Sequence, residues 1–557
     1  MKAEVVKILK KVLKELDVDV KEEDIAGKIE MPPSVDLGDY AFPCFFLAEK
    51  MKTSPEEIAL KIREKIGEME VKGFDDIQTS GSYVNFFADR KVLSLEILKE
   101  ILSKKEKYGS QNIGKGKKAL VEHTSINPNA SPHVGRVRNA IIGDSIVKIL
   151  DFMNFKPEVH YYVNDVSKQI AMLVVAGAEK LTFDKMLKAY MEISKKVENS
   201  KDVENQVFFW LRRFEGEDKE ARSKFKKITD TCVKGQKEIL ARLGINYHFF
   251  DYESNYLKKS REILEQLKAT KKVHKDKEGR TYLDQHGSHV QKMMKSPVLV
   301  LTRSDDTGLY PLRDLAYTID KLKKAEKNII VLGEDQKLYF LQQQEALKLL
   351  KSPSPEVVHY SFVLLSSEGK SKKMATRKGD VVLLEDFLND VIKKAEREVK
   401  KRKTEGDPKA VGISAVKYKI LRSSPNKSIN FDMDEALQFE GDTGPYLLYS
   451  YARAGSIFYK SKKRPSLILK ELDESEFNLI KKLSQFPDIA LNSYNTLNPS
   501  LIANYSYQLA QIFNEFYHSC PVIGAPEEEF RLAIIEAFRH VLKTSLGLLG
   551  IKAIEEM

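Results

Sequence analysis

The spacing of apolar and polar positions divides the chain into three regions. Residues 1–112 combine amphipathic helical segments with a short apolar run and predict a small α/β domain. In residues 113–425, short apolar runs alternate with helical patterns, which predicts an α/β domain with a doubly wound parallel sheet. A charged, mostly helical stretch at about 170–295 interrupts this alternation. Residues 426–557 carry apolar residues at i, i+3, i+4 and i+7 and predict an α-helical bundle.

The elements expected in the first two regions are short. Between these regions, residues 107–118 (KYGSQNIGKGKK) read as a linker, since they are rich in Gly and Lys. The first region should hold a helix at 54–66 and a hairpin-like run at 83–89. In the second, strands are expected at 118–122, 158–163, 297–301, 328–333 and 357–365, with helices at about 134–152, 312–324 and up to 350.

Composition limits the class of protein without identifying a partner. The chain has 557 residues, 42% of them apolar, which is enough for sizeable cores. Lys and Arg number 92 against 81 Asp and Glu, so the formal net charge is +11. A polyanionic partner is compatible with this excess, but the solvated faces of a lysine-rich protein explain it equally well.

Cysteine usage and hydropathy suggest a compartment. Cys44, Cys232 and Cys520 lie far apart and form no CxxC pair, so neither a disulfide framework nor a cysteine-based zinc site is expected. The amphipathic N-terminus lacks the apolar core of a signal peptide, and no apolar run reaches the roughly 18 residues needed to span a bilayer. We therefore expect a cytoplasmic protein without a membrane partner.

The most informative motif is VEHTSINPNASPHVGRVRNAIIGDS, at residues 121–145. A strand, a turn with two prolines and a helix start follow one another, and a helix start favours bound phosphate. Gly135 would let a flat base approach the backbone. His133 and Arg136 share a helix face and can both donate to phosphate oxygens, and Arg138 adds charge nearby. A lone histidine near a helix start is more often a cap or core residue, so a phosphate-binding role for His133 depends on the wider sequence pattern.

A second motif, SSEGKSKKMATRKGD, follows an apolar run at residues 366–380. A basic, glycine-flanked loop after a strand can close on a pyrophosphate and stabilise charge that develops in a transition state. By itself, a lysine cluster is usually a solvated surface loop. The presence of both motifs in one chain favours a catalytic loop over a surface loop.

Both motifs resemble the signatures of class I aminoacyl-tRNA synthetases. SPHVGRVRNAIIGD resembles the HIGH signature, and the wider VEHTSINPN segment resembles the arginine-specific branch, particularly its archaeal-type members. Lys373 and the three residues after it resemble the KMSK loop, with Lys370 and Lys372 as alternative registers. Arg136 stands at the second histidine of HIGH, and Ala375 replaces a serine. A guanidinium can still bind phosphate bidentately, so function should survive.

The resemblance implies an ATP site and an arginine site. ATP binding falls to Pro132, His133, Val134, Gly135, Arg136, Lys373 and Met374, and the catalytic residues are His133, Arg136, Lys373 and Arg377. A guanidinium pocket needs carboxylates, because an unpaired buried charge is very costly. Segments similar to those of the family assign arginine binding to Ser125, Asn127, Glu253, Tyr310, Asp314 and Glu334, with Asn164, Asp165 and Gln169 lining or supporting the pocket.

The outer regions resemble the RNA-binding parts of the family. Residues 439–457 resemble the start of its anticodon-binding bundle, where exposed aromatic side chains can stack on bases. Most aromatic residues there, such as Phe513 and Phe516, should belong to the core. The N-terminal region resembles the family's additional domain, in which Tyr83 and Asn85 occupy the places of residues that contact the D-loop of tRNA.

The implied activity is that of an arginine–tRNA ligase. L-Arginine attacks the α-phosphate of ATP, which arrives with Mg²⁺, and the arginyl group then passes to the 3′-terminal ribose of tRNA(Arg), releasing AMP and pyrophosphate. The family implies a monomer, no resident metal or prosthetic group, and a need for bound RNA in the first step. Two alternatives remain: a non-catalytic paralogue that binds tRNA, or a class I synthetase for another amino acid.

Overall fold

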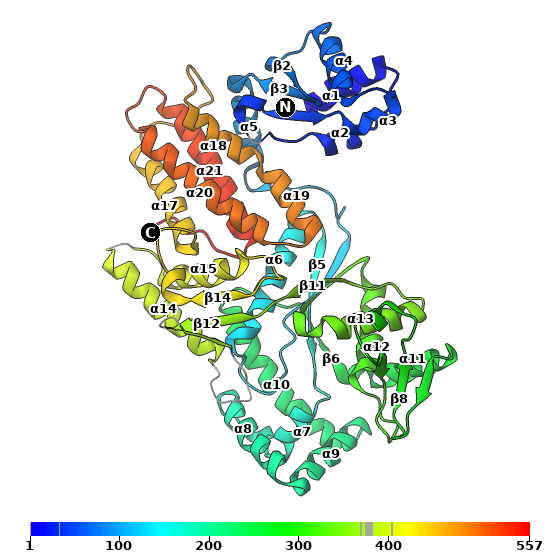
Figure 1. Cartoon of the computed structure of the whole chain (residues 1–557). Coiled ribbons are helices and arrows are strands. Elements are labelled where there is room, and N and C mark those ends of the chain that lie inside the picture. The colour runs from blue at the N-terminus through cyan, green and yellow to red at the C-terminus, as the bar shows by residue number, and fades with distance from the viewer. Residues whose placement is uncertain (1, 33, 368–369, 374–381, 403–404) are drawn as a thin grey trace. The chain divides into compact units, whose positions relative to one another are not determined.

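The computed structural model describes residues 2–32, 34–367, 370–373, 382–402 and 405–557 (Figure 1). These residues form two compact units. Unit 1 contains residues 1–105, 460–484 and 512–540, and unit 2 contains residues 106–459, 485–511 and 541–557. The C-terminal region expected at 426–557 is therefore divided between the units, because its two longest helices contribute to both.

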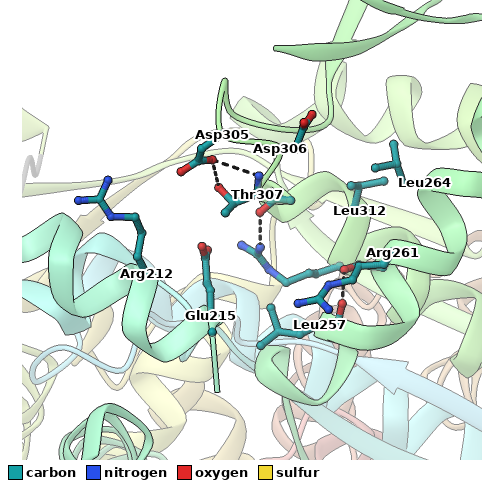
Figure 2. A pocket seen from close by; sticks show the side chains of 13 residues that line it. Arg212, Glu215, Leu257, Arg261, Leu264, Asp305, Asp306, Thr307 and Leu312 are labelled. Carbon is teal, nitrogen blue, oxygen red and sulfur yellow. Dashed lines mark hydrogen bonds between the residues drawn. The ribbon is translucent and has the colours of Figure 1, made fainter. Parts of the chain in front are cut away.

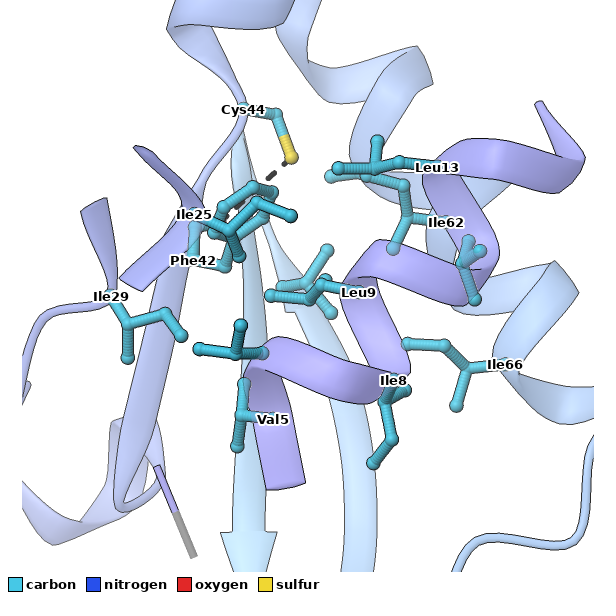
Figure 3. Packing of buried hydrophobic residues seen from close by; sticks show 14 of the residues in the cluster. Val5, Ile8, Leu9, Leu13, Ile25, Ile29, Phe42, Cys44, Ile62 and Ile66 are labelled. Carbon is cyan, nitrogen blue, oxygen red and sulfur yellow. Dashed lines mark hydrogen bonds between the residues drawn. The ribbon is translucent and has the colours of Figure 1, made fainter. Parts of the chain in front are cut away.

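Unit 1 is built around a three-stranded antiparallel sheet of order β1-β3-β2. The apolar run at 83–89 forms the central strand β3, and the predicted helix at 54–66 is α4, capped by the hydroxyl of Ser54. Figure 3 shows Leu9 and Leu13 of α1 facing Ile62 of α4 across a core that includes Phe42 of β1. The elements are α1 (Lys2–Glu15), α2 (Glu22–Lys28), β1 (Tyr40–Pro43), α3 (Ala48–Met51), α4 (Pro55–Gly67), β2 (Phe74–Ser80), β3 (Tyr83–Ala88) and α5 (Arg90–Lys104).

The C-terminal region is helical from α17 onward, but the predicted start at 426 is too early, because Ile429–Asp432 form a strand. Phe513 and Phe516 are fully buried, and the ring of Phe513 stacks on Phe538 at 3.9 Å, so their assignment to the core is confirmed. In unit 1, Lys481 of α18 pairs with the buried Asp39 at 2.9 Å. The helices are α17 (Gly444–Lys460), α18 (Glu474–Ser484), α19 (Phe486–Thr496), α20 (Ser500–Ser519) and α21 (Glu528–Leu548).

Unit 2 contains a five-stranded, fully parallel sheet of order β11-β10-β4-β5-β6. This confirms the expected α/β class. The first strand, β4, lies in the middle; the next two strands extend the sheet on one side, and the last two extend it on the other. Its strands are β4 (Lys118–Glu122), β5 (Lys156–Val163), β6 (Phe249–Tyr252), β10 (Lys327–Gly333) and β11 (Glu356–Tyr360).

Three details of the sequence-based topology are wrong. The stretch at 170–295 is mostly helical, as predicted, but it does not simply interrupt the sheet, because β6 within it belongs to the parallel sheet. The run at 297–301 forms β9 (Val298–Val300), which pairs antiparallel with β8 (Thr281–Asp284) in a separate sheet that also contains β7 (Val273–Lys275). The run at 357–365 breaks after β11, and its second half enters a third sheet. A short apolar run does not reveal which sheet it will join.

The third sheet of unit 2 has the order β13-β12-β14, with β12 (Val363–Ser367), β13 (Lys370–Lys373) and β14 (Ile429–Asp432). Helices surround the sheets, and α7, α8, α9 and α10 form a subdomain around a core of their own (Figure 1). The remaining helices of the unit are α6 (Val137–Phe152), α7 (Lys168–Val175), α8 (Phe183–Asn199), α9 (Lys201–Glu215), α10 (Lys219–Ala241), α11 (Leu257–Ala269), α12 (Tyr310–Lys324), α13 (Lys337–Leu349), α14 (Leu384–Lys401), α15 (Pro408–Leu421) and α16 (Met433–Ala436).

Candidate active site

The candidate residues of unit 2 follow the carboxyl ends of parallel strands. The segment of Ser125 and Asn127 follows β4, Glu253 follows β6, and Glu334 follows β10. Carboxyl ends of parallel strands share one edge of a sheet. Beside β4 the chain reverses the direction in which it adds strands, and a crevice at such a switch point is the usual ligand site of this architecture. The fold therefore gathers residues from distant parts of the sequence at one edge.

The segment after β4 has an unusual backbone. Thr124 and Ser125 have φ angles of 87° and 43°, values that residues with a Cβ rarely adopt. The side chain of Asn139 on α6 holds this conformation, because its Oδ1 accepts the N–H of Thr124 at 2.5 Å while its Nδ2 donates to the carbonyl of Val331 at 2.8 Å. Asn139 thus connects the strained segment to α6 and β10, a role that its position in the sequence did not reveal.

Two buried side chains support the rest of this segment. Gln236 of α10 donates to the carbonyls of Asn127 and Ala130 at 3.0 and 2.9 Å. The hydroxyl of Tyr161 donates to the carbonyl of Ile126 at 2.9 Å and contacts the side chain of Gln236 at 2.7 Å. The half-buried residues Ser125 and Asn127 therefore stand on a braced backbone. Gln236 resembles an ordinary helix residue in the sequence, and no local signal predicts this contact.

The first motif forms a short 3-10 turn, not the expected start of an α-helix. Val134–Arg136 make the turn, and α6 begins only at Val137. Burial and the neighbouring Arg136 lower the pKa of His133 to about 4, so its imidazole is neutral near pH 7. Its Nδ1 is buried without a hydrogen-bond partner among the described residues. His133 can thus serve a ligand as a neutral hydrogen-bonding group, and Arg136 is the cation of this turn.

Gly135 and Arg138 have clear structural roles. A Cβ at Gly135 would lie 3.0 Å from the His133 ring, so the glycine makes room for this imidazole. The sequence suggested that Arg138 adds charge to a phosphate site, and this prediction is wrong. The Arg138 side chain is fully buried and donates to the carbonyls of Ser361 and Ser424 at 2.7 and 3.1 Å. Such a buried guanidinium fastens α6 to the loops beside the third sheet.

The first motif pairs through its backbone with the segment that follows the second. The N–H of Val134 donates to the carbonyl of Val382 at 3.1 Å, and the N–H of Leu384 donates to the carbonyl of Pro132 at 2.8 Å. His133 and Leu383 form the β-bridge between these bonds. Residues 382–384 lie shortly after the second motif in the sequence, and it is this following segment that pairs with the HIGH-like turn.

The other end of the second motif lies in a strand. Lys370 and Lys373 are the first and last residues of β13, which pairs antiparallel with β12, and Lys373 stands opposite Leu364. Met374 and Arg377, two further candidates for this site, lie outside the described residues, as does Ala375.

Glu253 lies at the centre of a buried charge cluster. The residue is 1% exposed, and its Oε1 accepts a hydrogen bond from Nε of Arg313 at 2.5 Å. Its Oε2 has no hydrogen-bond partner among the residues that the structure describes. Burial raises the pKa of Glu253 to about 8, with the charge of Arg313 lowering it and that of Asp314 raising it. An unoccupied buried carboxylate oxygen is a site for a cationic ligand.

Asp314 is the second acidic group of the cluster. Its Oδ2 accepts the hydroxyl of Tyr339 at 2.6 Å, and burial raises its pKa to about 6. Tyr310, one turn earlier on α12, is half exposed, and its ring lies 5.1 Å from that of Tyr339. Burial raises the pKa of Tyr162, and the charges of Glu253 and Asp314 raise it further. The two carboxylates therefore act on one another and on the same tyrosine.

Further polar atoms around this cluster are buried without partners in the described part of the chain. They are the hydroxyl of Tyr162, Oδ1 of Asn164 and Oε1 of Gln169. Native proteins rarely leave buried polar atoms unsatisfied, so a polar ligand is a physical explanation for this group. Asp165 instead accepts the N–H of Ser254 at 2.9 Å and supports the turn that carries Glu253. Glu334 is exposed and lies in a 3-10 turn after β10.

A cavity of about 400 Å³ is lined in part by Arg313 of the cluster (Figure 2). Its walls come from α9, α11, α12 and the loop at 305–308, and it is lined by none of the residues predicted for ATP or arginine. Figure 2 shows Asp305 and Thr307 hydrogen-bonded on the loop above Glu215. Glu215 pairs with Arg303 at 3.2 Å, which braces the same loop.

The candidates for RNA contact lie in unit 1. Tyr83 is half-buried, and its ring meets that of the exposed Phe45 at 5.6 Å. Asn85, in the middle of β3, is only 4% exposed. Tyr83 and Phe45 thus present aromatic surface at the end of the sheet, whereas Asn85 is held within it. Phe45 was not predicted, because it lies in a separate segment of the sequence.

Neither a cluster of metal-ligating side chains nor a membrane-spanning helix is present in the described part of the chain. Within the described ranges, no group of three or more His, Cys, Asp or Glu side chains is arranged to hold a metal ion. No helix in the same ranges combines the length and the apolar character that crossing a membrane requires. The three cysteines are buried and unpaired.

Comparison with known proteins gives matches along the whole chain. Family models match in three consecutive segments: the arginyl tRNA synthetase N-terminal domain at residues 3–88, the catalytic domain of class I (R) tRNA synthetases at 97–433 and the DALR anticodon-binding domain at 447–557. An arginine–tRNA ligase of Methanocaldococcus jannaschii is 36% identical, over 98% of this chain and 96% of the relative. One from Methanocella arvoryzae is 38% identical, over 92% of each protein.

Solved structures give the same pattern of similarity. The arginyl-tRNA synthetase of Thermus thermophilus has a TM-score of 0.81 at 25% identity, and the match covers 99% of both chains. A methionyl-tRNA synthetase of Mycobacterium tuberculosis has a TM-score of 0.52 at 11% identity over 78% of this chain and 91% of that chain, which shows a shared fold.

Proposed function

The chain belongs to the arginyl-tRNA synthetase family, and we propose that it ligates L-arginine to tRNA(Arg) at the edge of its parallel sheet. In the first step, the carboxylate of arginine attacks the α-phosphorus of ATP and pyrophosphate leaves. In the second step, a hydroxyl of the terminal ribose of the RNA attacks the acyl carbon and AMP leaves. Arginyl-adenylate connects the two steps.

One observation carries this proposal for the pocket. Glu253 is a buried carboxylate with one oxygen bonded to Arg313 and the other without a partner among the described residues, while Asp314 acts on it electrostatically. Such a site is electrostatically incomplete until a cation arrives. A substrate guanidinium would supply that charge, with Tyr310 packing over its side chain and Ser125 and Asn127 contacting its amino-acid end. Glu334 would add a polar contact to the substrate.

The nucleotide side of the mechanism depends on positioning and charge. We assign Pro132, Val134 and Gly135 to contacts with ATP, the neutral His133 to a hydrogen bond with phosphate, and Arg136 to ionic contact. Lys373, Met374 and Arg377 would act on the leaving pyrophosphate. ATP would arrive as its magnesium complex, in which the ion offsets phosphate charge. The pairing of 132–134 with 382–384 supports joint action of the two motifs.

The remaining parts of the proposal concern RNA, assembly and location. The D-loop of tRNA would contact Tyr83 and Phe45, and also Asn85, whose side chain is less exposed. The C-terminal helices would bind the anticodon. A monomer is proposed from the family alone. A cytoplasmic location is proposed because the three cysteines remain unpaired.

The amino acid that the purified protein attaches to total tRNA tests the proposed function. We expect acid-labile charging with arginine alone out of the twenty amino acids, and ATP–pyrophosphate exchange that requires arginine and is measured with tRNA present. A protein that binds tRNA but supports neither reaction would be the non-catalytic paralogue. Charging with a different amino acid would identify a synthetase of another specificity.

A further inference from the structure

Arg313 has no role in the mechanism above, although its side chain is hydrogen-bonded to Glu253 of the proposed arginine pocket. It lies on α12 between Tyr310 and Asp314, is 3% exposed, and donates through Nε to Oε1 of Glu253 at 2.5 Å. Its NH1 donates to the carbonyl of Gly308 at 2.7 Å. The guanidinium is therefore held at two points, once by the carboxylate and once by the loop beside the cavity in Figure 2.

We propose that Arg313 is a positioning and specificity residue: it holds one oxygen of Glu253 so that the other is directed to the guanidinium of the substrate. This inference rests on the proposed function, because it assigns the free oxygen to arginine. Arg313 itself does not touch the substrate in this scheme and acts through Glu253.

Charge balance explains why a resident guanidinium is needed. Glu253 and Asp314 together can carry two negative charges in a buried site, and Arg313 compensates one of them. Negative charge then remains to be matched by the ligand, since Asp165 is a further carboxyl group that acts on Glu253. An arginine side chain supplies one positive charge, whereas a neutral side chain of the same length would leave the remaining negative charge uncompensated.

Geometry favours a guanidinium over an ammonium as the holder. Arg313 uses Nε for the carboxylate and NH1 for the Gly308 carbonyl, so one planar group satisfies both contacts and fixes the direction of Glu253. A lysine would keep the charge without this fork. Arg313→Lys should therefore have an intermediate effect, and Arg313→Gln, which removes the charge, a larger one.

The ionisable and charged groups that face Glu253 come from two other elements. They are Arg313 and Asp314 on α12, and Asp165 after β5. Without Arg313, the carboxyl groups of Asp314 and Asp165 remain, and both disfavour ionisation of Glu253. The pH at which arginine binding reaches half of its maximum should then move upward.

The test is steady-state ATP–pyrophosphate exchange with tRNA present, in wild type, Arg313→Gln, Arg313→Lys and a control, Arg303→Gln. Arg303 is a good control because it braces the same loop through Glu215 and Thr307 without contacting Glu253. We expect Arg313→Gln to raise the KM for arginine about a hundredfold and Arg313→Lys about tenfold, with the KM for ATP unchanged. The control should stay within about threefold of wild type.

A double variant tests whether Arg313 acts through Glu253. If it does, Glu253→Gln alone and Glu253→Gln with Arg313→Gln should lose arginine affinity to the same extent. Once the Glu253 carboxylate is gone, Arg313 no longer has a carboxylate to position. The double variant also removes the buried unpaired charge, so it provides folded protein if Arg313→Gln alone does not fold.

Three results would overturn the proposal. One is an Arg313→Gln enzyme with an unchanged KM for arginine and an unchanged pH profile; another is a control that loses arginine affinity to the same degree; the third is additive losses in the double variant. A wild-type protein that shows no arginine-dependent exchange would instead refute the proposed function, which keeps the two failures distinct.

Discussion

The two sides of the candidate site are built differently. On the proposed arginine side, Glu253 opens a 3-10 turn after β6 and Asp314 lies on α12, and both carboxylates are already hydrogen-bonded to neighbouring side chains. On the nucleotide side, His133 and Arg136 lie on a 3-10 turn that is held by backbone pairing with 382–384. Under the proposed function, specificity would depend on side-chain contacts that are already formed, whereas phosphate binding would depend on a turn held by backbone pairing.

The largest expected effect comes from the proposed arginine side. Asp314→Asn should lower kcat/KM for arginine roughly a hundredfold to a thousandfold in the exchange reaction, because it removes one carboxylate partner of a buried charge. Asp320→Asn is the matched control on the same helix, since Asp320 pairs with Lys259 at 3.2 Å. An equal loss in both variants would show that α12, and not the Asp314 carboxylate, is responsible.

A change on the nucleotide side should affect a different step. Lys373→Ala is expected to slow adenylate formation about a hundredfold, the scale of one lost transition-state contact, while tRNA affinity stays close to wild type. Single-turnover formation of arginyl-adenylate and tRNA binding by filter retention measure the two quantities. Equal losses in both would remove Lys373 from its catalytic assignment, and Lys370→Ala and Lys372→Ala test the alternative registers.

The two sides should also differ in their response to pH. A proton on Glu253, whose pKa burial raises to about 8, or on Asp314, whose pKa is raised to about 6, competes with the guanidinium. Below the pKa of Glu253, kcat/KM for arginine should therefore fall about tenfold for each pH unit. His133, with its pKa lowered to about 4, adds no titration in this window. A profile that is flat from pH 6 to 8 contradicts this assignment, and Glu253→Gln should lose the limb assigned to Glu253.

The smallest expected effect comes from the support of the strained segment. Asn139→Ala removes bonds to Thr124 and Val331 and should lower the free energy of unfolding by about 1–3 kcal/mol, with a raised KM for arginine or ATP. Asn328→Ala, another buried asparagine at the amino end of β10, should destabilise the protein without the effect on KM. Denaturant titration and exchange kinetics separate the two outcomes.

Local patterns predicted the elements better than the contacts between them. The strand at 118–122 and the helix ending at 152 agree with β4 and α6, because apolar periodicity is a local property. The run at 297–301 joined another sheet, since its length and composition suit either one. The helix start at His133 was placed too early, because a 3-10 turn and the first turn of an α-helix have similar sequence requirements.

Charged groups show the same limit. Arg138 and Arg136 are two residues apart and equally basic, yet one is fully buried against backbone carbonyls and the other is part of the candidate site. The contact between Glu253 and Arg313 joins residues 60 positions apart in the sequence, and no spacing rule predicts it. Motif resemblance suggested the residues of the proposed pocket, whereas their pairing and pKa shifts required the fold.

The most direct test of the account compares arginine with citrulline, which has the same length and a neutral ureido group, in ATP–pyrophosphate exchange with tRNA present. If Glu253 and Asp314 form a pocket that requires a cation, kcat/KM for citrulline should be at least about a thousandfold lower than for arginine. Comparable activity with the two amino acids would show that the buried carboxylates do not recognise the substrate, and would contradict the account.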